Sequence, residues 1–286
     1  MFWATYKASL KNIIRAKSFW LALAVLLVFV GYSVASVIHQ SYSYEINDVV
    51  EQGHPLFVFS YRNYIQKCNG VVANMLSYSV PIFTVVVTVL LLTRDHGDRF
   101  FEIEKAGGMK AWKYLYARLF AAFTVCFSIT AILCFVYLHG QMIPMLGCDE
   151  MTTAEYFTDS AFRLSAQIIA SVPPCIIFYM CATYLTGTLL KSGIGAAAVN
   201  LAYVIFCYIY DMLNIENRGL FMEYLRPSNP IKLNYYMYYF DSEWFEWMKE
   251  TFDTSLGKAL LCWSILIGAS AVFNALSHIM VRKRSV

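Results

Sequence analysis

Residues 164–210 read LSAQIIASVPPCIIFYMCATYLTGTLLKSGIGAAAVNLAYVIFCYIY, with Lys191 as the only charged side chain. The apolar runs 164–190 and 192–210 flank this lysine, and about 20 apolar residues are enough for a helix to cross the hydrocarbon core of a bilayer. Lys191-Ser192-Gly193 leaves room only for a tight hairpin between the two runs. The stretch therefore predicts two antiparallel transmembrane helices.

The rest of the chain follows the same pattern, because its charges are gathered between long uncharged runs. Of the 286 residues, 59% are hydrophobic and 14% are charged, whereas soluble domains have about 25% charged residues. Backbone polar groups within lipid must pair inside their own segment, and a barrel strand would alternate apolar with polar residues, so helices are expected. The sequence predicts an all-α integral membrane protein with six transmembrane helices, at about 18–38, 74–93, 119–138, 164–190, 192–210 and 259–281.

Lysine and arginine divide the connections into two alternating groups. Residues 1–17, 94–118, 191 and 282–286 hold fourteen of the 22 Lys and Arg but four of the 19 Asp and Glu. Basic connections stay in the cytoplasm. We therefore expect a multi-pass protein of the cell membrane, of the bacterial plasma membrane type, with both termini in the cytoplasm. The net charge of +3 without a long basic block gives no indication of a nucleic-acid partner.

The first seventeen residues are amphipathic. Apolar side chains share one broad face at helical spacing, and three basic side chains lie four residues apart on another. This pattern indicates an interfacial helix held on the inner leaflet by apolar burial and by anionic membrane lipid. The alternative is a simple basic anchor for the first span. The apolar face consists of Phe2, Trp3, Tyr6, Leu10, Ile13 and Ile14, and the basic residues are Lys7, Lys11 and Arg15.

Two further features are expected on the external side. Residues 211–258 are acidic and rich in Tyr and Trp, which favour the membrane interface, and Pro227 and Pro230 interrupt them. We expect this segment to be broken and re-entrant. Cys68 and Cys148 also lie externally, where a disulfide between them is compatible with the compartment but not required by it. The other six cysteines fall within apolar runs, which predicts buried hydrophobic side chains.

The connection 94–118 carries a short charged segment with two phenylalanines. Residues 98–106 read DRFFEIEKA, and the following Gly107 and Gly108 would end a helix. An exposed pair of Phe side chains is typical of a docking surface for a cytoplasmic partner. A solvated turn whose Phe side chains rest on the membrane fits these residues equally well.

The layout of the whole chain resembles a permease subunit of the type-2 ATP-binding-cassette (ABC) exporter family. The N-terminal helix runs into Lys17-Ser18-Phe19-Trp20, like the family's elbow helix. The second span is followed by Asp95-His96-Gly97-Asp98-Arg99-Phe100-Phe101-Glu102, Arg118 opens the third span, and a broken aromatic segment precedes the last span. Where the family commonly has Glu, and Gly followed by Thr, this chain has Asp95 and Gly97-Asp98.

This resemblance implies a coupling helix that docks on a cytoplasmic ABC ATPase subunit. It also implies a second permease chain, identical or homologous, and ATP and Mg bound by the partner ATPase. Export of an amphiphilic or hydrophobic substrate (a drug, a lipid-like molecule or an antimicrobial peptide) would follow. The docking role falls on Asp95, Asp98, Arg99, Phe100, Phe101, Glu102 and Glu104.

No motif indicates catalysis within the chain. The phosphate-binding pattern GxxxxGK[ST] is absent, and the five histidines are scattered without metal-ligand spacing. We expect no catalytic residue, no metal ligand and no cofactor in this chain. The uncharged polar residues within the spans are expected to line a pathway or to bridge helices. These residues are Asn200, Gln167, Asn274 and His278.

Two other classes of function stay open on the sequence. One is a membrane-embedded enzyme, which would need a cluster of charged or histidine side chains near the interface. The other is a stand-alone immunity or sensor protein without transport activity. A neighbouring gene for an ATPase would favour the permease over both.

Overall fold

The computed structural model describes residues 2–44, 75–93, 108, 110–141, 166, 168–212, 226–228, 231 and 256–283. All regular secondary structure in these ranges is helical. Within these described ranges, six helices are long and apolar enough to cross a bilayer, as the sequence predicted, and they indicate a membrane protein. The qualifying stretches are Lys17–Ser36, Met75–Thr93, Trp112–Tyr137, Ile168–Leu190, Gly193–Tyr210 and Leu260–Val281.

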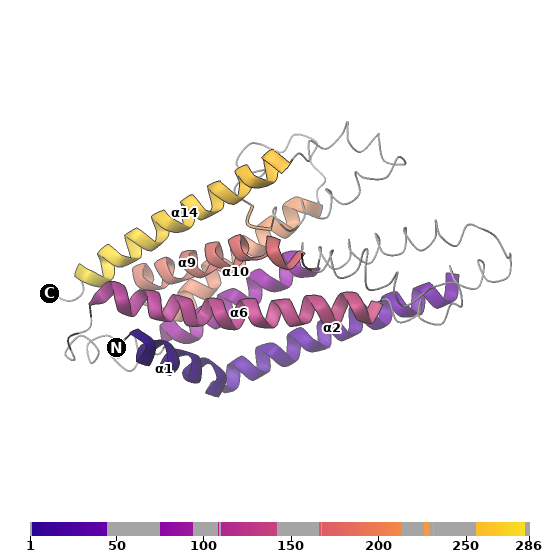
Figure 1. Cartoon of the computed structure of the whole chain (residues 1–286), viewed down its shortest axis with the longest axis horizontal. Coiled ribbons are helices and arrows are strands. Elements are labelled where there is room, and N and C mark those ends of the chain that lie inside the picture. The colour runs from indigo at the N-terminus through magenta and orange to yellow at the C-terminus, as the bar shows by residue number, and fades with distance from the viewer. Residues whose placement is uncertain are drawn as a thin grey trace.

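The helices run roughly along one long axis, and α9 lies among its neighbours at the centre (Figure 1). Helix α9 contacts α6, α10 and α14, while α6 also contacts α1 and α2. The start of α1, the start of α6 and the end of α14 lie at one end of the molecule in Figure 1. The labelled helices are α1 (Phe2–Arg15), α2 (Lys17–Tyr44), α6 (Ala111–Gln141), α9 (Pro173–Leu190), α10 (Gly193–Met212) and α14 (Leu256–Lys283).

A turn at Ala16 separates α1 from α2. The indole Nε1 of Trp20 donates a 2.7 Å hydrogen bond to the carbonyl of Ile14, which satisfies an acceptor in the last turn of α1. The backbone N–H groups of Ala16 and Phe19 bond to the carbonyls of Ile13 and Ala16, at 3.1 and 3.0 Å. These bonds fix the angle at which the chain leaves α1.

Two consecutive prolines interrupt the helix at the start of α9. Pro173 and Pro174 lack an N–H group, so the carbonyls one turn earlier lose their helical donors. The N–H of Val172 bonds instead to the carbonyl of Ile169 (3.3 Å), and Ser171 Oγ donates to the carbonyl of Ile168 (2.7 Å). The prolines then occupy the first positions of α9, where no donor is required.

The hairpin between α9 and α10 is tight, as residues 191–193 predicted. Lys191 ends α9 with the left-handed dihedrals φ 52° and ψ 29°. Ser192 begins α10 by accepting a 3.1 Å bond at its Oγ from the N–H of Gly195. This is an N-cap interaction that satisfies one of the free donors of a helix start.

Two glycines of this hairpin allow the helix Met75–Thr93 to approach closely. A Cβ atom on Gly187 would lie 2.4 Å from Leu92 Cδ1, and one on Gly193 would lie 2.7 Å from Thr93 Cγ2. Small residues let helix backbones approach each other within a bilayer. The hairpin and the helix Met75–Thr93 therefore pack as one unit.

The apolar stretch of helix α6 begins earlier than the predicted third span. The expected third span started at residue 119 with Arg118 just before it, but α6 starts at Ala111 and Arg118 lies within it. At 1.5 Å per residue its 31 residues extend about 46 Å, which exceeds the roughly 30 Å hydrocarbon core. Helix α6 is therefore longer than the hydrocarbon core is thick, and its first turns can lie outside the hydrocarbon.

Helix α1 also differs from its sequence pattern. The apolar face was expected to lie in the inner leaflet, but part of it packs on protein: Ile13 is buried, and Tyr6 and Leu10 are partly buried against the core. Thr5 and Ser9 are buried as well, and α1 packs on α6. Trp3 and Ile14 of the expected face are 61% and 43% exposed. The small side chains of Thr5 and Ser9 allow α1 to lie close to α6, while Lys7, Lys11 and Arg15 are exposed.

Candidate functional site

Asn200 lies in the contact between α9 and α10. Its Nδ2 donates to Thr186 Oγ1 and to the carbonyl of Ala196, both at 2.8 Å. The Thr186 hydroxyl in turn donates to the carbonyl of Ala182 at 2.9 Å. Asn200 is buried, so its amide bridges two helices, which is one of the two roles expected for it.

Asn274 joins α14 to α6. Its Nδ2 donates a 3.0 Å hydrogen bond to the hydroxyl of Tyr116, across a large separation in sequence. The Tyr116 side chain is 47% exposed, so this bridge lies at the edge of the bundle. His278 follows Asn274 by one helical turn and is half-buried. The two residues share one side of α14.

Arg118 is a buried cation that the sequence pattern placed at the start of the third span. Only 1% of its surface is exposed. Its Nε donates a 2.8 Å bond to the hydroxyl of Tyr114, and its guanidinium carbon lies 4.9 Å from the centre of the Tyr114 ring. The spacing of four residues between a tyrosine and an arginine in one helix is the sequence feature that predicts this contact.

A second buried arginine comes from the segment between α10 and α14. Arg226, Ser228 and Ile231 are all buried, and Arg226 Nε donates to Ser228 Oγ at 3.1 Å. Arg226 lies within electrostatic range of Tyr179 on α9 and Tyr203 on α10. This part of the connection therefore packs into the helix bundle, within the segment that the sequence predicted to be broken and re-entrant.

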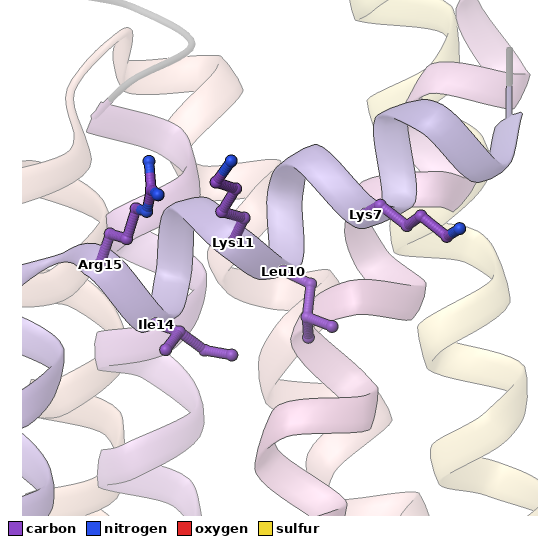
Figure 2. A pocket seen from close by; sticks show the side chains of 5 residues that line it. All are labelled: Lys7, Leu10, Lys11, Ile14 and Arg15. Carbon is purple, nitrogen blue, oxygen red and sulfur yellow. The ribbon is translucent and has the colours of Figure 1, made fainter.

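The outward surface of α1 carries a shallow groove of about 390 Å³. Basic and apolar side chains line it together: Lys7, Lys11 and Arg15 with Leu10 and Ile14. Figure 2 shows Lys11 and Arg15 extending to one side of the helix, and Leu10 and Ile14 to another. The basic residues and the apolar residues are those that the sequence pattern singled out.

Several predicted site residues lie outside the described residues. They are the docking residues Asp95, Asp98, Arg99, Phe100, Phe101, Glu102 and Glu104, the polar residue Gln167, and the cysteines Cys68 and Cys148. Among the described residues, no group of three or more His, Cys, Asp or Glu side chains could hold a metal ion. The six described cysteines are buried thiols, as their apolar surroundings predicted.

The structure therefore offers helix bridges, two buried arginines and a basic groove on α1. No Asp or Glu lies in the six apolar stretches of the described helices. A comparison of the sequence with protein-family models and with curated proteins finds no match.

Proposed function

We propose that this chain is the membrane-spanning permease subunit of an exporter of the type-2 ABC family. It works with a cytoplasmic ATPase on a separate chain, which binds ATP and Mg, and with a second permease chain. It exports an amphiphilic or hydrophobic substrate, such as a drug, a lipid-like molecule or an antimicrobial peptide. The location is the plasma membrane, with both chain termini in the cytoplasm.

The observation that carries the proposal is the way in which the chain enters its bundle of six apolar helices. The amphipathic α1 packs on α6 and continues into α2 through a turn, which is stabilised by the hydrogen bond from Trp20 Nε1 to the carbonyl of Ile14. This arrangement supports an elbow helix of the kind that the sequence resemblance implies. The six apolar stretches contain no Asp or Glu, which supports an external source of energy, because carriers driven by protons or cations commonly hold a carboxylate within the membrane.

The mechanism uses the connection 94–118 as the point of attachment. Closure of two ATPase subunits around ATP draws the segments 98–106 of two permease chains together. The attached spans tilt, and a path between the two permeases changes sides. Differential affinity of the two conformations for the ATP-bound ATPase dimer is the driving force.

The test is co-purification of the ATPase with a variant of the docking segment. Phe100→Asp with Phe101→Asp places two charges where apolar contact is proposed, and the ATPase should no longer co-purify. The control is Tyr235→Asp with Tyr236→Asp, an adjacent aromatic pair expected on the external side, which should retain the ATPase. Retention by the Phe100/Phe101 variant contradicts the docking role.

A second measurement tests the substrate class. The purified complex should hydrolyse ATP faster when amphiphilic drugs, lipid-like molecules or cationic amphipathic peptides are added. If no ATPase accompanies the wild-type chain from its native membrane, the proposal fails and the stand-alone immunity or sensor function replaces it.

A further inference from the structure

The outward face of α1 presents two parallel ridges. Lys7, Lys11 and Arg15 follow one another at intervals of four residues, and Leu10 and Ile14 form a second row beside them. Residues three and four apart are neighbours on a helix surface, so Lys7 lies beside Leu10, Lys11 lies beside Ile14, and Arg15 lies beside Lys11. All five side chains line the same groove (Figure 2).

The opposite face of α1 fixes these ridges in place. Thr5, Ser9 and Ile13 are buried, α1 packs on α6, and the hydroxyl of Tyr6 donates to Thr124 Oγ1 of α6 at 3.3 Å. Tyr6 also contacts Phe120 of α6, with ring centres 5.4 Å apart. The groove is therefore held on a rigid support, with its three cations exposed and Leu10 partly buried against the core.

The charge of the groove has no counterpart on its own helix. Helix α1 contains no Asp or Glu, and Lys7, Lys11 and Arg15 are exposed. An arginine and lysines at this spacing match the oxygens of a phosphate group. The groove therefore favours an anionic ligand with phosphate chemistry.

The apolar ridge decides between a free phosphate and a lipid. Ile14 is 43% exposed and Trp3 is 61% exposed on the same short helix, which would be unfavourable in water next to a cationic row but favourable in the interfacial layer of a bilayer. Arg15 is separated from the apolar helix α2 by Ala16 alone, so the cations lie at the boundary of the hydrocarbon. A volume of about 390 Å³ is at the small end of ligand sites, which suits a headgroup whose acyl chains remain in the bilayer.

We propose that this groove is a binding site for an anionic phospholipid. The phosphate lies between Lys11 and Arg15, Lys7 contributes at the far end, and the upper part of an acyl chain runs along Leu10 and Ile14. The site orders a lipid along α1. This lipid-binding site does not depend on whether the chain works with an ATPase.

The test is native mass spectrometry of the full-length chain in detergent, titrated with phosphatidylglycerol or phosphatidylcholine. A cation near an anionic membrane surface contributes about fivefold in affinity. Lys11→Gln should therefore weaken phosphatidylglycerol binding about fivefold, and the triple variant Lys7→Gln, Lys11→Gln, Arg15→Gln about 100-fold, with little effect on phosphatidylcholine. The single variant changes one exposed side chain, so it keeps the test valid if the triple variant fails to fold.

The matched control removes three exposed lysines expected at the same membrane face but outside the groove. Lys110→Gln, Lys113→Gln and Lys191→Gln together should leave phosphatidylglycerol affinity within about twofold of wild type. An equal loss in this control would show that general surface charge binds the lipid, and it would overturn the proposal.

The apolar ridge and the source of the phosphate are tested separately. Leu10→Ser with Ile14→Ser should weaken phosphatidylglycerol binding while all three cations remain. Inorganic phosphate at millimolar concentration should not displace the lipid. If inorganic phosphate competes, if the Ser variant binds phosphatidylglycerol as tightly as wild type, or if the triple variant keeps its affinity for phosphatidylglycerol, then the proposal is wrong.

Discussion

The two innermost transmembrane helices and the peripheral ones are equally apolar but have very different surroundings. In their most apolar windows, 61% of the residues of Met75–Thr93 and 72% of those of Ile168–Leu190 are buried, against 6% for Lys17–Ser36 and 22% for Leu260–Val281. Hydrophobicity makes all these helices suited to lipid but does not decide which of them pack together, because lipid tails are as apolar as leucine. Close approach at glycines and a few hydrogen bonds make that distinction.

The largest effect is expected where the inner helices approach most closely. Gly187→Val directs a branched side chain into Leu92, and overpacking of this kind costs typically about 1–3 kcal/mol. The measurement is reversible unfolding of the purified protein in mixed micelles. The loss should be partly recovered when Leu92→Ala is added, because that change opens the space that valine needs.

Gly268→Val is the matched control on the periphery. Gly268 is also within a long helix, α14, but nothing lies within 4 Å of the position that its Cβ would occupy. The unfolding free energy of the Gly268→Val variant should stay within about 0.5 kcal/mol of wild type, since the helix propensity of valine is slightly more favourable than that of glycine. Equal destabilisation by the two substitutions would break the comparison between inner and peripheral helices.

The next effect concerns two tyrosines of α6 that lie two residues apart. Tyr114 is 1% exposed and accepts a bond from the buried Arg118, whereas Tyr116 is 47% exposed. Hydrogen bonds to charged groups contribute about 1.5–3 kcal/mol, so Tyr114→Phe should cost about 1.5 kcal/mol in unfolding free energy. Tyr116→Phe should cost clearly less, and a reversed order would show that Arg118 is held mainly by other groups.

A smaller effect is expected at the bridge between α9 and α10. A double-mutant cycle with Asn200→Ala and Thr186→Val isolates the bond between the two side chains. Such bonds between transmembrane helices average about 0.6 kcal/mol and reach about 1.7 kcal/mol. A coupling energy of zero would mean that the bond between Asn200 and Thr186 does not stabilise the bundle, and that Asn200 has another role, such as contact with a transported molecule.

The smallest effect is expected at the edge of the bundle. Breaking the bond between Asn274 and Tyr116 with Asn274→Leu should change the unfolding free energy by about 0.5 kcal/mol or less, because the tyrosine is exposed. If the residue lines a pathway, the substitution changes substrate-stimulated ATPase activity of the complex far more than stability. A loss of stability as large as that of Gly187→Val would place Asn274 among the main packing contacts instead.

The sequence predicts the helices better than their packing. The six apolar runs and the hairpin at Lys191 follow from length and charge alone, because a helix in lipid has one required length and few permitted charges. The role of Gly187 depends on Leu92, which is remote in sequence, and no local pattern reveals that pairing. The burial of Thr5 and Ser9 in α1 cannot be predicted from the local sequence either. The hydrophobic pattern identifies only the apolar face of the helix, whereas these two residues are buried because their small side chains fit the contact with α6.

Among the candidate site residues, the easiest to predict are those whose placement follows from their near neighbours in the sequence. The basic and apolar rows of α1 follow from helical periodicity, and the structure places them in one groove. Arg118 was expected at the start of a span because charge marks a boundary, and its burial depends on a tyrosine partner one turn away. The burial of Arg226 depends on how a distant segment returns to α9 and α10, which periodicity does not report.

The central claim is that six apolar helices cross the membrane with their basic connections in the cytoplasm. The most direct test is labelling of intact cells with a membrane-impermeant thiol reagent, using Lys110→Cys for the connection 94–118 and Glu246→Cys for the segment 211–258, each in a variant lacking Cys68 and Cys148. The account predicts that Glu246→Cys is labelled in intact cells and that Lys110→Cys is labelled only after the membrane is opened. Labelling of Lys110→Cys from outside intact cells would contradict it, and the proposed attachment of a cytoplasmic ATPase would fail with it.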